Sequence, residues 1–92
     1  MDEISFEEFK RLDLRVGKVV VAERVKGTRK LLVLKVDFGS EQRQAVAGLA
    51  EHHKPEQLLG NKYMFLCNLE HKKLMGIESE CMILAADDGR GN

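Results

Sequence analysis

The 92-residue sequence contains no tryptophan, a single proline and only two cysteines, and its formal net charge is zero. Two cysteines are too few for the disulfide framework of a small secreted scaffold. Because Cys67 and Cys81 both lie in short apolar runs, we interpret them as reduced, buried side chains. No apolar run approaches the ~20 residues that a membrane-spanning helix needs. The length is that of one domain, so a large multidomain enzyme is excluded as well.

The first residues also lack the basic and apolar stretch of a secretory signal peptide. Residues 1–9 hold four acidic side chains and no basic one. We therefore expect a cytoplasmic protein. At 43% hydrophobic residues the chain is too apolar for a disordered tail, and we expect residues 1–92 to form a single domain.

A catalytic or metal-binding pattern is missing from the sequence. His52 and His53 are adjacent, so on a strand they point to opposite faces, and His71 lies in a polar segment. There is no Cys-x-x-Cys or His-x-x-x-His spacing of the kind that zinc sites use. Glu78 and Glu80 can share one face of a strand but lack a second acidic wall. We expect no catalysis, no metal and no cofactor.

Positive charge is concentrated in one part of the chain. Residues 10–35 hold nine lysines and arginines against two acidic residues, whereas the rest of the chain holds six basic and thirteen acidic residues. This asymmetry favours a surface that faces a polyanion on an otherwise acidic body. An ordinary solvated face is the alternative that charge alone leaves open.

The first secondary-structure signal is a helix start. The Ser5 hydroxyl can cap the amide of Glu8 while the Glu8 side chain reaches back, and Ile4 can pack against Phe9. Phe6 and Phe9 fall on one helical face. We predict a short N-terminal helix over about residues 5–12 that plugs part of the fold.

The rest of the chain has the β-branched, alternating pattern of strands. We predict strands over residues 15–22, 31–38, 43–49, 63–69 and 79–86. Proline at the start and glycine at the end of residues 54–60 predict one helical turn. Gly17 and Gly48 fall inside predicted strands, where glycine is typical of a bulge or sharp bend.

This order of elements predicts an all-β fold. Five strands with a helical turn between the third and fourth match the oligonucleotide/oligosaccharide-binding (OB) barrel. Another small β-barrel has the same strand count, and the helical turn favours the OB-fold.

An OB barrel binds its ligand across the second and third strands, between the first–second and fourth–fifth loops. Basic side chains at those positions are Arg24, Lys26, Arg29, Lys30, Lys35, Arg43, Lys72 and Lys73. By strand alternation, Lys35 lies on an outward face, where it can meet a phosphate. Nucleic acid is therefore the ligand that the charges favour.

Aromatic side chains are too few for a base-stacking platform. The chain has one tyrosine and four phenylalanines, of which the helix uses Phe6 and Phe9, and Tyr63 and Phe65 share one face of an apolar strand. Phe38 alone is left free by this pattern. Recognition of folded RNA by shape and backbone fits better than stacking of single-stranded bases.

The junction of the fourth and fifth strands resembles the signature of the tRNA-binding domain family. It reads Asn-Leu at 68–69, Lys-Lys-Leu-Met-Gly-Ile-Glu-Ser-Glu at 72–80 and Met-Ile-Leu-Ala-Ala at 82–86. Upstream agreement runs through residues 12–18, 30–37, 43–44 and 47–49, so the resemblance covers residues 6–89. The family includes a module or beta subunit of methionyl-tRNA synthetase, stand-alone tRNA-binding proteins and the secretion chaperone CsaA.

The resemblance implies a non-catalytic OB-fold that binds tRNA with little sequence preference. It also implies that the module helps an aminoacyl-tRNA synthetase to hold its tRNA, and the methionyl enzyme is the partner that we expect. By motif position, the residues that match the family's tRNA contacts are Lys35, Asn68, Lys73, Met75, Ser79 and Met82. Lys72, Arg29, Lys30 and Arg43 join them on the basis of charge. Alternative roles stay open: Met75 and Met82 as core residues, Asn68 and Ser79 as turn-stabilising residues.

The family also implies a second reading, a dimeric peptide-binding chaperone of the CsaA kind, for which Met64, Leu66 and Met75 are candidate groove residues. A homodimer is a further partnership that the resemblance allows. The sequence departs from the family at Cys81, where relatives usually have glycine, and at residues 25–31, where an acid is replaced by cations.

Overall fold

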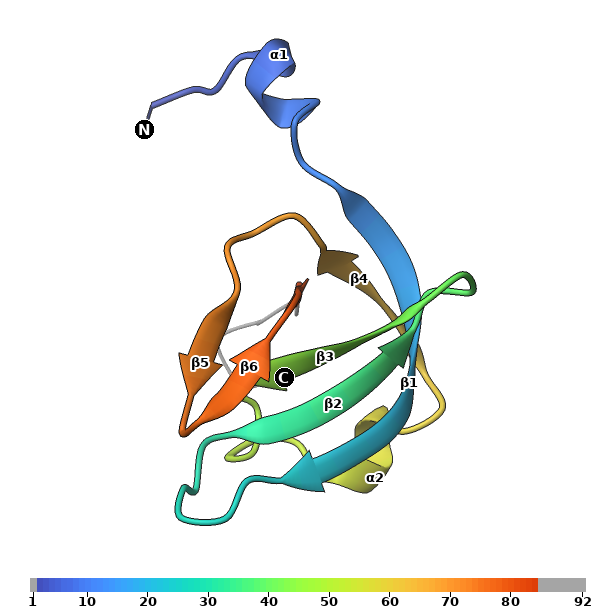
Figure 1. Ribbon diagram of the computed structural model, residues 1–92, viewed down its shortest axis with the longest axis vertical. Coiled ribbons are helices and arrows are strands. Elements are labelled where there is room, and N and C mark those ends of the chain that lie inside the picture. Colours follow the sequence, from blue (N-terminus) through green and yellow to red (C-terminus); the bar gives the residue numbers. More distant parts are fainter. Residues whose placement is uncertain (1, 85–92) are drawn as a thin grey trace.

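The computed structural model of the protein describes residues 2–84 (Figure 1). Within these residues the chain forms two short helices and seven strands. In chain order they are α1 (Phe6–Phe9), β1 (Leu14–Arg24), β2 (Leu32–Asp37), β3 (Gln42–Ala47), α2 (Pro55–Leu58), β4 (Lys62–Leu66), β5 (Lys72–Leu74), β6 (Ile77–Ser79) and β7 (Met82–Ile83).

Five antiparallel strands form a barrel in the order β3–β2–β1–β4–β7. The long strand β1 pairs with β2 through residues 18–24 and with β4 through residues 14–18. Its register with β2 shifts between Val19 and Val21, and such a bulge bends a strand. The edge strands β3 and β7 contact each other, so the sheet closes on itself. The predicted five-stranded OB-fold barrel is confirmed.

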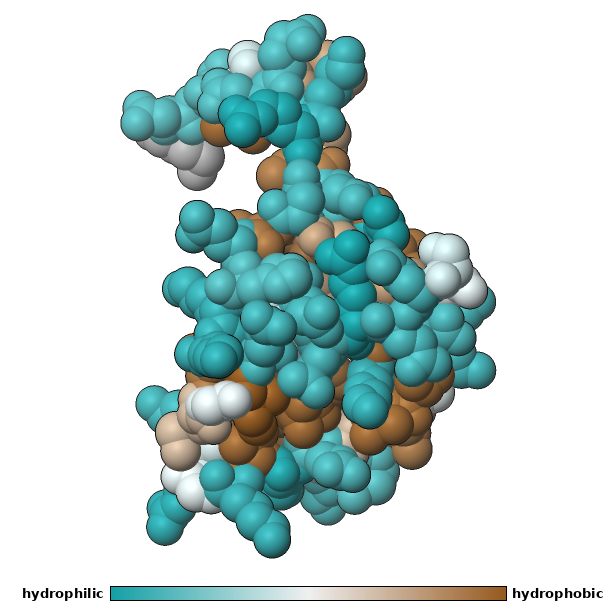
Figure 2. Space-filling model, viewed as in Figure 1, coloured by the Kyte–Doolittle hydropathy of each residue, from teal (hydrophilic) through white to brown (hydrophobic). Residues whose placement is uncertain are grey.

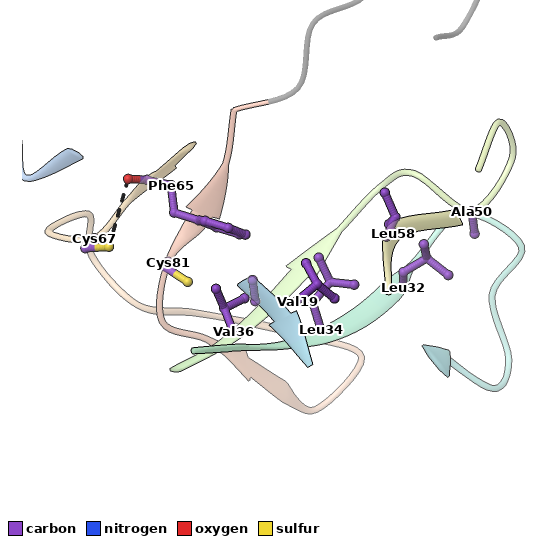
Figure 3. Packing of buried hydrophobic residues seen from close by; sticks show 10 residues of the cluster. Val19, Leu32, Leu34, Val36, Ala50, Leu58, Phe65, Cys67 and Cys81 are labelled. Atoms are coloured by element: carbon purple, nitrogen blue, oxygen red, sulfur yellow. Dashed lines mark hydrogen bonds between the residues drawn. The ribbon is translucent and has the colours of Figure 1, made fainter. Parts of the chain in front are cut away.

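Alternation along β2 decides which side chains fill the barrel. Leu32, Leu34 and Val36 are fully buried, whereas Lys35 is exposed on the opposite face. The three apolar side chains meet Val19 and Phe65 in one cluster (Figure 3). Burying side chains of this size contributes roughly 1.5–3 kcal/mol each, so this cluster dominates the stability of the barrel.

Phe38 is part of this packing, which corrects the prediction that it is free. Its ring meets the Phe65 ring edge to face, with centroids 5.6 Å apart. The close approach of β1 to β2 also explains why residue 17 is a glycine. A Cβ atom at Gly17 would collide with the side chains of Val36 and Phe38, at 2.7 Å from the Phe38 ring. Glycine is therefore required for close packing and not for the bulge, which lies two residues further on.

The β5–β6 hairpin was not predicted from the sequence. Its two-residue turn, Met75–Gly76, has positive φ at both positions (53° and 78°), which is the turn geometry that antiparallel hairpins favour. Gly76 suits this turn, but methionine is rare at positive φ, so Met-Gly differs from the usual Asn-Gly or Asp-Gly turn sequence. The predicted strand 79–86 is wrong in its first three residues, because Ser79 belongs to β6 and the barrel strand β7 covers only Met82–Ile83. Its last two residues lie outside the described part of the chain.

The N-terminal helix begins as predicted and packs differently. Ser5 and Glu8 form the capping box, with the Glu8 amide donating to Ser5 Oγ at 3.1 Å. The helix ends at Phe9 and projects away from the barrel (Figure 1). Phe6 is 70% exposed and Phe9 47% exposed, with their rings 6.4 Å apart. The prediction that this helix plugs the fold is therefore wrong.

The second helix, α2, lies between β3 and β4, where one helical turn was predicted. Pro55 occupies its first position, and Leu58 is buried in the core cluster. Gly60 follows with a φ of 84°, and its amide donates to the Val19 carbonyl at 2.8 Å. Neither described helix is long and apolar enough to cross a membrane.

Gly17 gives a direct test of this packing. Gly17→Ala places a methyl group against Val36 and Phe38, and we expect the free energy of unfolding to fall by about 1–3 kcal/mol. The matched control is Gly48→Ala, because nothing lies within 4 Å of a Cβ there. Urea unfolding of both variants measures the difference. Equal stabilities would show that β1 and β2 do not approach as closely as described.

Candidate nucleic-acid interface

The tip of the β5–β6 hairpin lies close to the loop between β1 and β2. A Cβ atom at Gly27, in that loop, would lie 3.5 Å from Met75 Cε at the hairpin tip. Met75 is 60% exposed, so it is not the core residue that one alternative suggested. The two loops that rim an OB-fold ligand face are therefore adjacent, as Figure 1 shows for the hairpin beside the start of β2.

This junction gathers exposed cations. The β1–β2 loop contributes Lys26, Arg29 and Lys30, and the hairpin contributes Lys72 and Lys73. In the described part of the chain none of these five side chains forms an ion pair. Unpaired, solvated cations on one rim are suited to phosphate oxygens and cost little to bring into contact with them. Figure 2 shows hydrophobic surface close to the same hairpin tip.

Lys35 has acidic neighbours, which distinguishes its surroundings from those of the rim cations. It pairs with Gln44 across β2 and β3 and shares a shallow cavity of about 270 Å³ with acidic neighbours. The lining residues are Lys35, Gln42, Arg43, Gln44, Glu78 and Glu80. The two carboxylates offset the charges of Lys35 and Arg43, which reduces the attraction for a phosphate, so Lys35 is a weaker candidate than the rim cations.

Arg43 is held by internal partners. Its guanidinium donates to the Cys67 carbonyl at 2.6 Å and pairs with Glu41 at 3.0 Å, and its side chain is 22% exposed. Glu41 also pairs with Arg15, whose guanidinium is bonded to Asp13. That hydrogen bond from Arg15 lowers the pKa of Asp13 below its usual value, so the carboxylate stays ionised into more acidic solution than a free aspartate would. Through its hydrogen bond to the Cys67 carbonyl, Arg43 links β3 to the residue that follows β4.

Asn68 also has internal partners for both ends of its amide. Its Oδ1 accepts from the Asp13 amide at 2.8 Å, and its Nδ2 donates to the Arg11 carbonyl at 2.5 Å. These bonds join the end of β4 to the segment between α1 and β1. Asn68 therefore stabilises the fold, although it does so through long-range bonds and not through a local turn as the alternative had it. A contact of Asn68 with tRNA stays a prediction.

Ser79 closes the barrel seam beside β3. Its hydroxyl accepts from the Val46 amide at 3.0 Å and donates to the Cys81 carbonyl at 3.1 Å. The neighbouring Glu80 accepts from the Gln44 amide through its carboxylate and donates its own amide to the Gln44 carbonyl at 2.7 Å. Both hydrogen-bonding functions of the Ser79 hydroxyl are thus used within the protein.

Both cysteines are free and buried, in agreement with their prediction as structural residues. Burial raises the pKa of the Cys81 thiol to about 11 and raises that of Cys67 as well. A thiol with a raised pKa stays protonated at neutral pH and is a poor nucleophile. Met82, 42% exposed, lines a small cavity next to Cys81 and is also not a core residue.

Sequence reasoning missed a cluster that the hairpin creates. His71, Glu78 and Glu80 each place one possible ligand atom within 4.8 Å of the others. Exposed carboxylates commonly gather without an ion, so this cluster by itself is not a metal centre. It was missed because His71 and Glu78 are brought together only by the unpredicted pairing of β5 with β6.

A small antiparallel barrel with adjacent loops that carry unpaired cations defines a nucleic-acid-binding module of the OB class. Residues 14–92 match the family model described as "Putative tRNA binding domain", and the chain belongs to this tRNA-binding domain family. The resemblance found in the sequence is confirmed.

Relatives of known sequence and structure agree with this assignment. The chain is 53% identical over 89 residues to methionine–tRNA ligase of Thermococcus kodakarensis, covering 97% of this chain and 12% of the relative. It therefore spans a small part of the curated relatives it matches. The structure resembles the MetRS related protein from Pyrococcus horikoshii with a TM-score of 0.93 and 42% identity, covering 97% and 82% of the two chains. Chaperone CsaA from Bacillus anthracis has a TM-score of 0.86 at 30% identity, covering 99% and 84%.

The role of Asn68 is open to a clear test. Asn68→Ala removes the hydrogen bonds to Arg11 and Asp13, and we expect the Asp13 amide to exchange hydrogen faster and the free energy of unfolding to fall by about 1–2 kcal/mol. We expect the affinity for bulk tRNA to stay within twofold of wild type, in a titration run beside the exchange measurement. A large loss of tRNA affinity with unchanged amide protection would instead make Asn68 a tRNA contact.

Proposed function

We propose that residues 1–92 act as one non-catalytic, cytoplasmic module that binds tRNA through phosphate and backbone contacts. The module raises the tRNA affinity of an aminoacyl-tRNA synthetase, and the proposed partner is the methionyl enzyme. The observation that carries the proposal is the proximity of the hairpin tip to the β1–β2 loop, which brings together two groups of cations that form no ion pair with any described residue. Family membership and the identity to methionine–tRNA ligases support the same partner.

The mechanism is electrostatic and positional. Each lysine or arginine that meets a phosphate releases bound counterions, which favours binding and makes it depend on salt. Because phosphates are the same in every tRNA, these contacts give affinity with little sequence preference. A module attached to or associated with a synthetase then keeps tRNA at a raised effective concentration near the catalytic site.

A peptide-binding chaperone of the CsaA kind has weaker support. The chain is about 50% identical to methionine–tRNA ligases and 30% identical to the CsaA structure. Of the three residues considered for an apolar peptide groove, Leu66 is only 8% exposed, and Met75 lies at the tip of the hairpin. The exposed Met64 belongs to a different surface.

That surface supports a homodimer as part of the proposal. Val16 pairs with Met64 across β1 and β4, and the amide of Leu84, the residue that follows β7, donates to the Met64 carbonyl, so the three apolar residues are neighbours. Val16 is 56% exposed and the other two are about 41% exposed. The uncovered apolar side chains of α1 add to this area. A second copy of the chain would cover both surfaces, since each copy offers the other a helix and a sheet face.

The rim cations can be tested by a double substitution. We expect Lys72→Ala with Lys73→Ala to weaken binding of bulk tRNA similarly for different tRNAs and to reduce the slope of log affinity against log salt by about one to two units. Binding titrations at several salt concentrations measure both quantities.

The matched control for this test is Lys18→Ala with Lys62→Ala, which removes the same charge from a cross-strand pair on β1 and β4. We expect a smaller loss of affinity there, because these lysines lie outside the hairpin and the β1–β2 loop. Equal losses for the two double variants would mean that net charge, and not the rim, determines binding.

The homodimer is tested with one exposed valine. We expect Val16→Lys to convert a dimer into a monomer in sedimentation equilibrium, because it places a charge in an apolar contact. Val21→Lys is the control, since Val21 is also exposed on β1 but pairs with Lys35 on the other half of the barrel. A wild-type protein that is monomeric at every concentration would overturn the dimer.

A further inference from the structure

A small apolar cavity lies beside the cationic hairpin. Its volume is about 180 Å³, and it is lined by Val46, Leu69, Glu70, Lys72, Leu74, Ser79, Cys81 and Met82. Phosphate binding by the rim makes no use of such a cavity, because phosphates bind to charged and polar groups.

The floor of the cavity is apolar and its rim is polar. Val46 and Cys81 are almost fully buried, and Ser79 beside them has its hydroxyl bonded to Val46 and Cys81. Leu69 and Met82 are 48% and 42% exposed and give the walls an open apolar surface. Among the described residues, the charged members of the lining are Lys72 and Glu70.

The pairing of β5 with β6 separates the two hairpin lysines. Lys72 lies opposite Ser79, and both line the cavity. Lys73 lies opposite Glu78, and side chains alternate between the two faces of a strand, so Lys73 lies on the other face of the hairpin. One lysine of the basic pair therefore borders the cavity.

We propose that this cavity binds one unpaired nucleobase of the RNA, with the adjoining phosphate paired to Lys72. The inference rests on the proposed function and names the part of tRNA that the hairpin recognises. A cavity of this size is smaller than the ~300–1,000 Å³ of a pocket for a drug-sized ligand. It suits a single flat ring system better than a peptide segment.

The chemistry of an unpaired base matches the lining. Bases in loops and ends of RNA are unstacked, can turn outward, and bury their faces against protein side chains. Apolar side chains, like aromatic ones, pack against the faces of a base that is turned out of its stack. The ammonium of Lys72 and the carboxylate of Glu70 provide a donor and an acceptor for the base edge and its phosphate. In a duplex the bases are paired and cannot enter, so the cavity selects for unpaired RNA.

The test compares two RNAs that carry the same phosphates. One probe is a short single-stranded adenosine oligoribonucleotide, and the other is the same oligomer with abasic sites in place of its bases. We expect wild-type protein at low salt to bind the first about tenfold more tightly. We expect Lys72→Ala to weaken binding of both probes.

The cavity variant is Leu69→Ala with Met82→Ala, which removes apolar wall without changing charge. We expect it to lose the tenfold difference while it keeps the affinity for the abasic probe. Leu59→Ala, at an exposed leucine that follows α2, is the control and keeps the difference. Thermal midpoints verify that each variant is folded, and Leu74→Ala replaces the double variant if that one is not.

The outcomes distinguish the two proposals. Equal binding of the two probes by wild-type protein, with tRNA binding still dependent on Lys72 and Lys73, overturns the base site and leaves the proposed function standing. An intact difference in the folded cavity variant also overturns the base site. Failure to bind tRNA at low salt overturns the proposed function and this inference together.

Discussion

The barrel depends on a seam in which side chains add to a single backbone hydrogen bond, from the Glu80 amide to the Gln44 carbonyl. Strand β3 ends the sheet, and its amides at Gln44 and Val46 are met by the Glu80 carboxylate and the Ser79 hydroxyl. An unpaired amide buried at a sheet edge costs about 1–3 kcal/mol, so two such bonds decide whether the barrel closes. The short segment that supplies them is also the end of the hairpin, so closure and the position of the hairpin are determined together.

The seam also explains how one motif serves two purposes. The side chains of this segment point in two directions. Those of Ser79 and Glu80 bond to β3, whereas those of Lys72 and Lys73 are exposed to solvent. Ser79, which the sequence suggests as an RNA contact, therefore helps to hold the hairpin against β3. The hairpin in turn is the support that carries the two lysines. Cys81 lies below this support with its side chain buried, and burial raises the pKa of its thiol, so the thiol is uncharged at neutral pH.

Local patterns in the sequence predicted most of the fold. The capping box at Ser5 and the alternation of β2 each depend on residues a few positions apart. The roles of Asn68 and Arg43 could not be predicted in this way, because their partners lie 57 and 24 residues away and become neighbours only in the folded barrel. The hairpin was missed for a different reason, since its Met-Gly turn differs from the usual Asn-Gly or Asp-Gly turn sequence.

The attachment of α1 has a mechanical consequence. The helix has no buried residue, and its direction is determined at its base by hydrogen bonds from Asn68 and from the Cys67 amide to the Asp13 carbonyl. A force applied to the exposed phenylalanines of α1 is therefore transmitted through these hydrogen bonds to the start of β1 and the end of β4. A partner that holds this helix sets the orientation of the whole barrel, and with it the direction in which the cationic rim faces.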